Sequence, residues 1–136
     1  MDKFVTMKLK NHTKYNKKIL FVSVVCSDFV CNKSIIDEIA NQYEEHLKNN
    51  TELSVILDAR TLNFLNPKIA WEGANVLCRF NTLAKSNVLS SCLVINNKNI
   101  VNLINMIIKV HPLVVPFKIV KTNEEALNFF TENIKT

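Results

Sequence analysis

The stretch LSVILDARTLNFLNPKIAWEGANVL, residues 53–77, decides the fold that this sequence predicts. It opens with an almost continuous apolar run, residues 53–57, which ends at Asp58. Apolar residues that do not alternate with polar ones are typical of a strand buried on both faces, as in a parallel sheet between helices. Asn66-Pro67 then marks a helix start, because proline fits the first helical position, where its missing N–H costs nothing. The stretch therefore predicts a buried strand, a turn and a helix, which is half of a βαβ unit.

Hydrophobic periodicity predicts further strands and helices on both sides of this stretch. After the first two strands, strands and helices alternate, which is the pattern of βαβ units with right-handed crossovers. The order β-β-α-β-α-β-α-β-α therefore predicts one α/β domain over residues 1–136, with a single mixed, mostly parallel sheet and an antiparallel pair at its N-terminal edge. The expected strands are residues 4–10, 19–26, 53–58, 88–95 and 117–120, and the expected helices are residues 34–48, 67–85, 99–110 and a last helix that starts at the capping box 122–125.

Two of these helices carry specific expectations. The single glycine, Gly73, lies inside the long helix of the opening stretch, where glycine costs about 1 kcal/mol relative to alanine. A close approach of that helix to the sheet would explain the glycine, and a tolerated accident would explain it equally well. The helix at 99–110 has one polar stripe, formed by Asn102, Asn105 and Lys109, so it is expected to be well buried.

The composition is that of an ordinary globular domain, with 136 residues, of which 48% are hydrophobic and 21% charged. No metal or cofactor is expected, because the three histidines are scattered, with no carboxylate or cysteine at ligand spacing. No apolar run reaches the ~20 residues of a membrane span, and no secretory signal is expected. The four cysteines match no zinc or redox spacing and are expected to be reduced thiols of a cytoplasmic protein. They are Cys26, Cys31, Cys78 and Cys92.

Basic residues are concentrated at the start of the chain. Residues 1–18 contain six lysines and one acid, which gives +5, whereas the rest of the chain has 11 basic and 11 acidic residues. Such a segment can attract nucleic acid or an anionic membrane. The plainer interpretation is an edge strand whose lysines prevent edge-to-edge pairing. Only two of the 17 basic residues are arginine, the residue that leads in base and phosphate contacts. Neither nucleic acid nor membrane is therefore expected as the partner.

No arrangement of residues for catalysis stands out, so an enzyme is not expected. A single glycine excludes the glycine-rich phosphate loops and the nucleophile elbow. Asp58 follows a strand whose carboxyl end is where open α/β sheets place their ligands. A lone acid in a turn more commonly accepts hydrogen bonds from nearby backbone N–H groups, and that is the expectation for Asp58.

An apolar cluster surrounds the helix start at Pro67. A helix N-terminus offers free N–H groups, and aromatic side chains anchor many protein interfaces. The cluster therefore predicts a docking surface for a partner protein, although its apolar residues could equally plug the end of the sheet. The candidate residues are Phe64, Leu65, Asn66, Pro67, Lys68 and Trp71.

Over nearly the whole chain, the order of the elements resembles the STAS domain, the fold of anti-sigma factor antagonists and of the cytoplasmic tails of sulfate transporters. VILDARTLNFLNPKIAW, residues 55–71, is similar to the family's strand, aspartate, short loop, apolar pair and helix start. FKIVKTNEEALNFF, residues 117–130, is similar to its last strand and capped helix. Bacterial switch members carry a phosphorylatable serine or threonine at that helix start, whereas this chain has Asn66, Pro67 and Lys68. The resemblance therefore implies a docking surface without the phosphorylation switch.

The leading hypothesis is a non-enzymatic, cytoplasmic STAS-like module that binds an unidentified protein, with a homodimer left open as one form of that contact. The alternative is a small carrier of an apolar or lipid ligand. A carrier needs an internal pocket of ~300 Å³ or more, lined by side chains such as those of residues 100–110. A tightly filled core would argue against the carrier.

Overall fold

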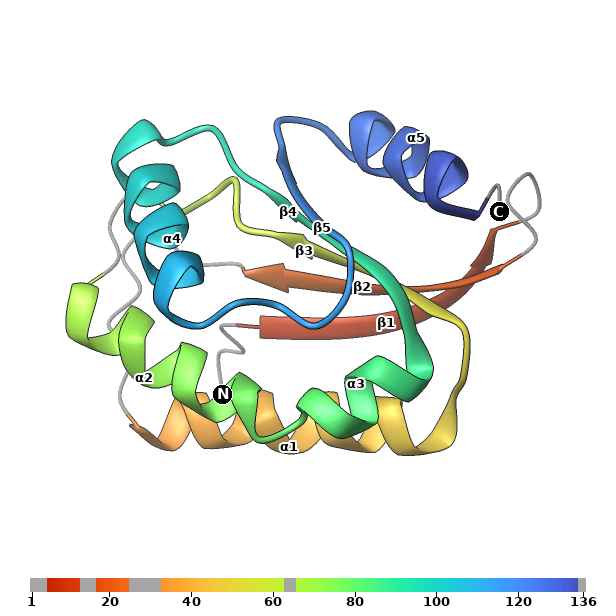
Figure 1. Cartoon of the computed structure of the whole chain (residues 1–136), viewed down its shortest axis with the longest axis horizontal. Helices are drawn as coiled ribbons and strands as arrows, with labels where there is room; N and C mark the ends of the chain where they lie inside the picture. The colour runs from red at the N-terminus through yellow and green to blue at the C-terminus, as the bar shows by residue number, and fades with distance from the viewer. Residues whose placement is uncertain (1–4, 13–16, 25–32, 63–65, 135–136) are drawn as a thin grey trace.

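One mixed sheet of five strands forms the centre of the molecule (Figure 1). The structure is a computed structural model that describes residues 5–12, 17–24, 33–62 and 66–134. The strands are β1 (Val5–His12), β2 (Lys17–Val24), β3 (Leu53–Asp58), β4 (Val88–Val94) and β5 (Phe117–Val120). The helices are α1 (Lys33–Asn49), α2 (Pro67–Cys78), α3 (Asn81–Asn87), α4 (Lys98–Val110) and α5 (Asn123–Ile134).

The strands lie in the sheet in the same order as in the chain, β1-β2-β3-β4-β5. β1 and β2 pair antiparallel, and the other neighbouring pairs are parallel. This arrangement confirms the predicted mixed sheet with an antiparallel pair at its N-terminal edge. It also places β3 in the middle, where Leu53 and Ile56 are both 0% exposed and belong to core clusters on opposite faces.

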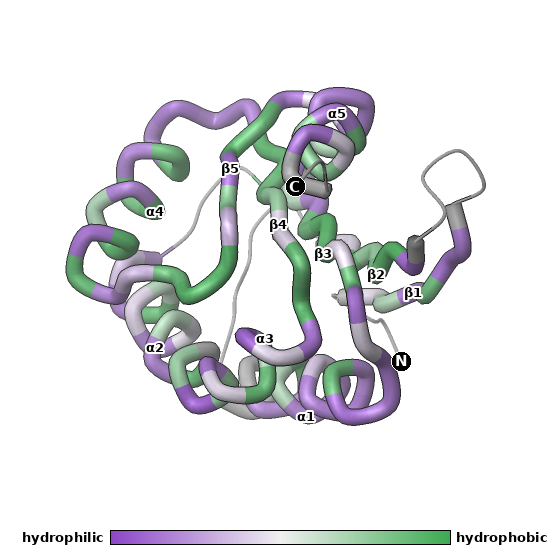
Figure 2. Tube along the Cα trace, turned by 45° about the vertical axis from the view of Figure 1, so that its right-hand side comes forward, coloured by the Kyte–Doolittle hydropathy of each residue, from purple (hydrophilic) through white to green (hydrophobic). Residues whose placement is uncertain are grey.

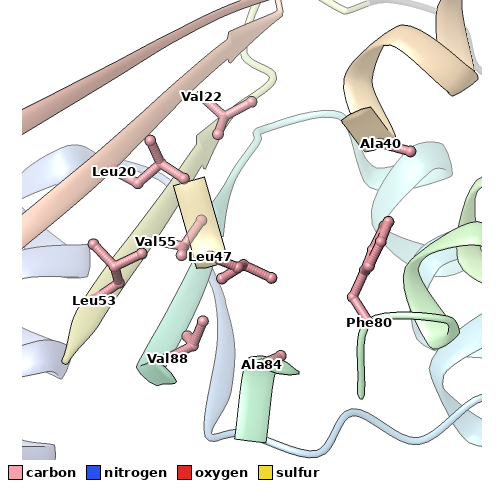
Figure 3. Packing of buried hydrophobic residues seen from close by; sticks show 9 residues of the cluster. All are labelled: Leu20, Val22, Ala40, Leu47, Leu53, Val55, Phe80, Ala84 and Val88. Carbon is pink, nitrogen blue, oxygen red and sulfur yellow. The ribbon is translucent and has the colours of Figure 1, made fainter. Parts of the chain in front are cut away.

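The helices cover the two faces of the sheet unequally. On one face, side chains of β2, β3 and β4 pack against α1, Phe80 and α3 (Figure 3). Further along that face, Leu93 and Phe117 pack with residues of α4. On the other face, Ile56 and Val94 pack against α5, which lies across the sheet from α1 and α3 in Figure 1. Each parallel strand is added at the same edge of the sheet by a crossover of the same hand, so the helices in these crossovers lie on the same face. Among the described helices, α5 is the one that covers the other face.

The helix expected over residues 67–85 is wrong in one respect, because the structure has two helices there, α2 and α3. The chain turns at Arg79, whose backbone N–H donates to the carbonyl of Val76. Phe80 then enters the core, where it is 9% exposed and its ring lies 6.2 Å from that of Tyr43 in an edge-to-face contact. The carbonyl of Phe80 starts α3 by accepting from the N–H of Ala84 at 2.7 Å. The break is therefore made by packing, since no proline or glycine lies at that point.

One further expectation about helices is wrong, and one open alternative is decided. The helix α4 is not well buried: Ile100 and Ile107 are buried, but Met106 is 60% and Val110 58% exposed. Of the two explanations for Gly73, a close approach does not hold, because a Cβ placed there would meet no heavy atom of the described residues within 4 Å. The glycine is therefore tolerated by an open position on α2.

Candidate functional site

Asp58 at the carboxyl end of β3 is held by its own turn. One carboxylate oxygen accepts hydrogen bonds from the backbone N–H of Arg60 at 3.1 Å and from its Nε at 3.0 Å, and the other accepts from Nη2 at 2.7 Å. The hydrogen bond from the Arg60 side chain is the main reason that the pKa of Asp58 lies below its ordinary value. The expected turn role of Asp58 is confirmed, and its oxygens are occupied by Arg60.

The helix start at Asn66 and Pro67 is also confirmed. The Oδ1 of Asn66 accepts from the backbone N–H of Lys68 at 2.9 Å, and its carbonyl accepts from the N–H of Ala70 at 2.9 Å. This side chain caps the helix as a serine or aspartate would. Asn66, Pro67 and Lys68 are all exposed. The other two residues of the expected cluster at this start, Phe64 and Leu65, lie outside the described residues.

Trp71 connects α2 to the end of α4. Its ring meets that of His111 edge to face, with centroids 4.6 Å apart, and the indole remains 40% exposed. The Nδ1 of His111 lies 3.8 Å from the Sγ of Cys78. The Nε2 of His111 is buried, and within the described part of the chain it has no hydrogen-bond partner.

Exposed aliphatic side chains follow this contact along the chain. Val110 and Leu113 flank His111 closely in sequence and are 58% and 41% exposed, and Val114 is 41% exposed. Met106 lies one helical turn before Val110 and is 60% exposed. Trp71 touches His111, which directly follows Val110 in the chain, so we group these exposed side chains with Trp71. We name this surface the α2–α4 patch, and its members are Trp71, Met106, Val110, Leu113 and Val114.

A cavity of about 610 Å³ lies between α4 and the edge strand β5. Its size falls within the range of pockets that hold small ligands. Side chains from the segment 100–110 contribute to it, but it is an open groove and not the internal pocket of the carrier hypothesis. The lining residues are Ile95, Asn96, Lys98, Val101, Asn102, Asn105, Ile108 and the continuous segment 117–121.

Comparison with solved structures identifies the architecture. An uncharacterised protein of the DUF3478 family from Shewanella loihica PV-4, described as having a SpoIIAA-like fold, superposes with a TM-score of 0.66 over 93% of each chain, at 11% sequence identity. The chain has a SpoIIAA-like fold. This finding confirms the STAS-like resemblance at the level of the fold. No family model and no curated protein matches the chain.

In the part of this SpoIIAA-like chain that the structure describes, no group of three or more histidine, cysteine or acidic side chains could hold a metal ion. Cys78 and Cys92 are free thiols, and burial raises the pKa of Cys92 to about 11. Cys26 and Cys31 lie outside the described residues. No described helix combines the length and apolar character needed to cross a bilayer.

The lysines of the N-terminal edge fit the plainer interpretation of the basic segment. Lys8 and Lys10 lie on β1, which is the outer strand of the sheet. The Nζ of Lys10 lies 5.2 Å from the ring centroid of Phe21 on the neighbouring strand. A lysine that covers an aromatic ring at a sheet edge shields that edge from pairing with another chain.

Sequence reasoning found part of the α2–α4 patch and missed the rest. Trp71 and the helix start were named from their place after the buried strand. Met106 and Val110 were missed because α4 was expected to be buried, and Leu113 and Val114 follow that helix in a segment for which no site was predicted. A signal was present, since at 3.6 residues per turn Met106 falls within the polar stripe that contains Asn102 and Lys109.

Proposed function

We propose that this SpoIIAA-like protein is a non-enzymatic docking module that binds a partner protein through the α2–α4 patch. The observation that carries the proposal is the exposed ring of Trp71, which is fixed edge-on against His111, at the end of α4 where further apolar side chains are exposed. Exposed apolar side chains that form one surface mark interaction sites, and rigid aromatic side chains are their usual anchors.

The side chains of the patch indicate which chemical groups a partner would need. An apolar side chain of the partner would pack on Trp71, and an acidic group would face Lys68, which is exposed three residues earlier on α2.

Asn66 supports a constitutive contact over a phosphorylation switch. Its side chain already occupies the N–H of Lys68, and neither it nor the two residues that follow carry a hydroxyl group. Binding would then be regulated by the amount of partner or by the partner's own state.

The test uses the partner that wild-type protein recovers from its host lysate, identified by mass spectrometry, purified and titrated against variants. Trp71→Ala should weaken binding by about 30-fold or more, the loss expected of an interface anchor, and Lys68→Glu should weaken it less. Leu9→Ser is the matched control, because Leu9 is a comparably exposed apolar residue on β1. Unchanged affinity in Trp71→Ala would overturn the proposal, and sedimentation of wild type and Trp71→Ala would reveal whether the partner is a second copy.

A carrier of an apolar ligand is the second candidate, and the size of the cavity between α4 and β5 favours it. Native mass spectrometry of the purified protein should then show an added mass that organic extraction removes. A protein that never carries such a mass after exposure to lipid extract would exclude the carrier.

A further inference from the structure

The cavity between α4 and β5 borders an open edge of the sheet. In the described part of the chain, β5 pairs with β4 on one side and with no strand on the other. The carbonyl of Pro116 accepts from the N–H of Ser91, and that of Val120 accepts from Ile95, both at 2.9 Å. Strand groups alternate in direction, so the N–H and C=O groups of Phe117 and Ile119 point to the open edge.

The same two residues turn their side chains into the cavity. Phe117 and Ile119 pack with residues of α4 on one face, whereas Val120 packs with α5 on the other. Val101 and Ile108 line the cavity from α4, opposite them. Figure 2 shows β5 between β4 and α4. A strand's free backbone groups and an apolar groove therefore lie side by side along β5.

The charged residues that line this groove are all basic: Lys98 at the start of α4, Lys118 on β5 and Lys121 just after it. Lys118 alternates with Phe117 and Ile119 and pairs with Cys92 of the α5 side, so Lys98 and Lys121 are the cations on the groove side. Asn96, Asn102 and Asn105 add amide groups that can donate or accept. The groove is thus complementary to a ligand that is acidic, apolar at intervals and rich in backbone hydrogen-bonding groups.

We propose that the groove between α4 and β5 binds an extended acidic peptide segment of a partner, which adds to β5 as a sixth strand. Its backbone would pair with the outward groups of Phe117 and Ile119. Alternate apolar side chains would enter the groove beside Val101 and Ile108, and carboxylates at the end of the segment nearest the carboxyl end of β5 would face Lys98 and Lys121. A lipid tail would fill the apolar groove but would leave the strand's backbone groups unpaired.

This site is separate from the α2–α4 patch. The residues that line the groove include neither Trp71 nor the exposed side chains 106, 110, 113 and 114. Trp71→Ala should therefore leave binding at the groove unchanged, and reversal of the groove lysines should leave partner binding at the patch unchanged. Failure of one proposal can be told from failure of the other.

The experiment titrates the full chain with a fluorescent, acetylated peptide of about seven residues in which valine alternates with threonine and a glutamate stands at each end. Saturable binding is expected, and it should be lost when the peptide's outward-pairing amides are N-methylated, because N-methylation removes the strand donors. In hydrogen-exchange experiments, the peptide should slow the amides of Phe117 and Ile119 relative to the free protein.

Variants locate the site. Lys98→Glu combined with Lys121→Glu should weaken the peptide by about tenfold, and Lys85→Glu, at an exposed position on α3, should not change its affinity. Ile119→Pro removes an outward donor without touching the ladder to β4 and should abolish binding, with circular dichroism to verify its fold. Absent binding, binding that survives N-methylation, or indifference to the lysine reversals would overturn the proposal. Displacement of the peptide by dodecanoate at equal or lower concentration would assign the groove to a small amphiphile instead.

Discussion

Arg60 donates three hydrogen bonds to the carboxylate of Asp58, two residues away in the chain. At the scale of single residues, this pair shows how the end of a central strand is fixed. The turn that carries the chain away from β3 is closed by a charge pair and not by a glycine. A group that looked like a candidate ligand or base therefore serves to shape the loop that leads to α2.

The pair predicts a pH dependence of stability. Because Arg60 lowers the pKa of Asp58 in the folded protein, folding favours the carboxylate over the neutral acid. That stabilisation is complete above the ordinary pKa of 3.8 and is lost as pH falls through the lower, folded-state pKa. The free energy of unfolding of wild type should exceed that of Asp58→Asn at pH 7 by less than about 1 kcal/mol, since Arg60 is largely exposed.

Urea denaturation between pH 2 and pH 7 measures this difference. It should shrink below about pH 4, because the protonated acid resembles asparagine. Arg60→Gln removes the same pair from its other side and should show the same pH profile. A difference between wild type and Asp58→Asn that stayed constant down to pH 2 would contradict the assigned role of the pair.

At the scale of secondary structure, the pattern of residues predicted the elements well and their interruptions poorly. β3 and β5 have the predicted bounds, and the start of α2 lies where proline and asparagine placed it. The break between α2 and α3 was missed because it depends on Phe80 packing against Tyr43, which is distant in sequence. The exposure of Met106 on α4 was missed because burial of a helix depends on its neighbours as well as on its own stripe.

A substitution of Gly73 tests whether its position on α2 is open, as the structure shows. Its position on α2 has space for a methyl group, so Gly73→Ala removes the entropic cost of glycine without creating a clash. The free energy of unfolding should rise by about 0.5–1 kcal/mol, measured by urea denaturation at pH 7. A loss of stability would show that the helix approaches another part of the protein at this point.

At the scale of the whole molecule, the unequal covering of the sheet is the main feature that the sequence did not predict. Alternation of strands and helices indicates a parallel sheet but leaves the order of its strands open. The order decides which helices share a face, and it depends on pairings between distant segments. The same limit applies to the candidate sites, because both the α2–α4 patch and the groove beside β5 form where separate elements meet.

The helix α5 covers the second face of the sheet, and Phe130 is the largest α5 side chain that is fully buried against it. This side chain is 0% exposed and packs with Ile56 and Val94 under the helix. Phe130→Ala should lower the free energy of unfolding by about 3–5 kcal/mol, because truncation leaves a cavity that the sheet cannot fill. Phe129→Ala, at the partly buried neighbouring position, is the matched control and should cost clearly less. Equal losses in both variants, measured by chemical denaturation, would contradict this account of the second layer.

The agreement between strand order and chain order has a consequence for synthesis on the ribosome. When each strand is synthesised, the strand with which it pairs has already been synthesised, so the sheet can grow at one edge and no strand has to insert between two others. The helices that connect these strands are synthesised between them and can pack on their face of the sheet as it grows. The side chains of Ile56 and Val94 cannot pack against α5 until that helix follows β5 out of the exit tunnel. During translation we therefore expect a chaperone to bind this apolar face of the sheet.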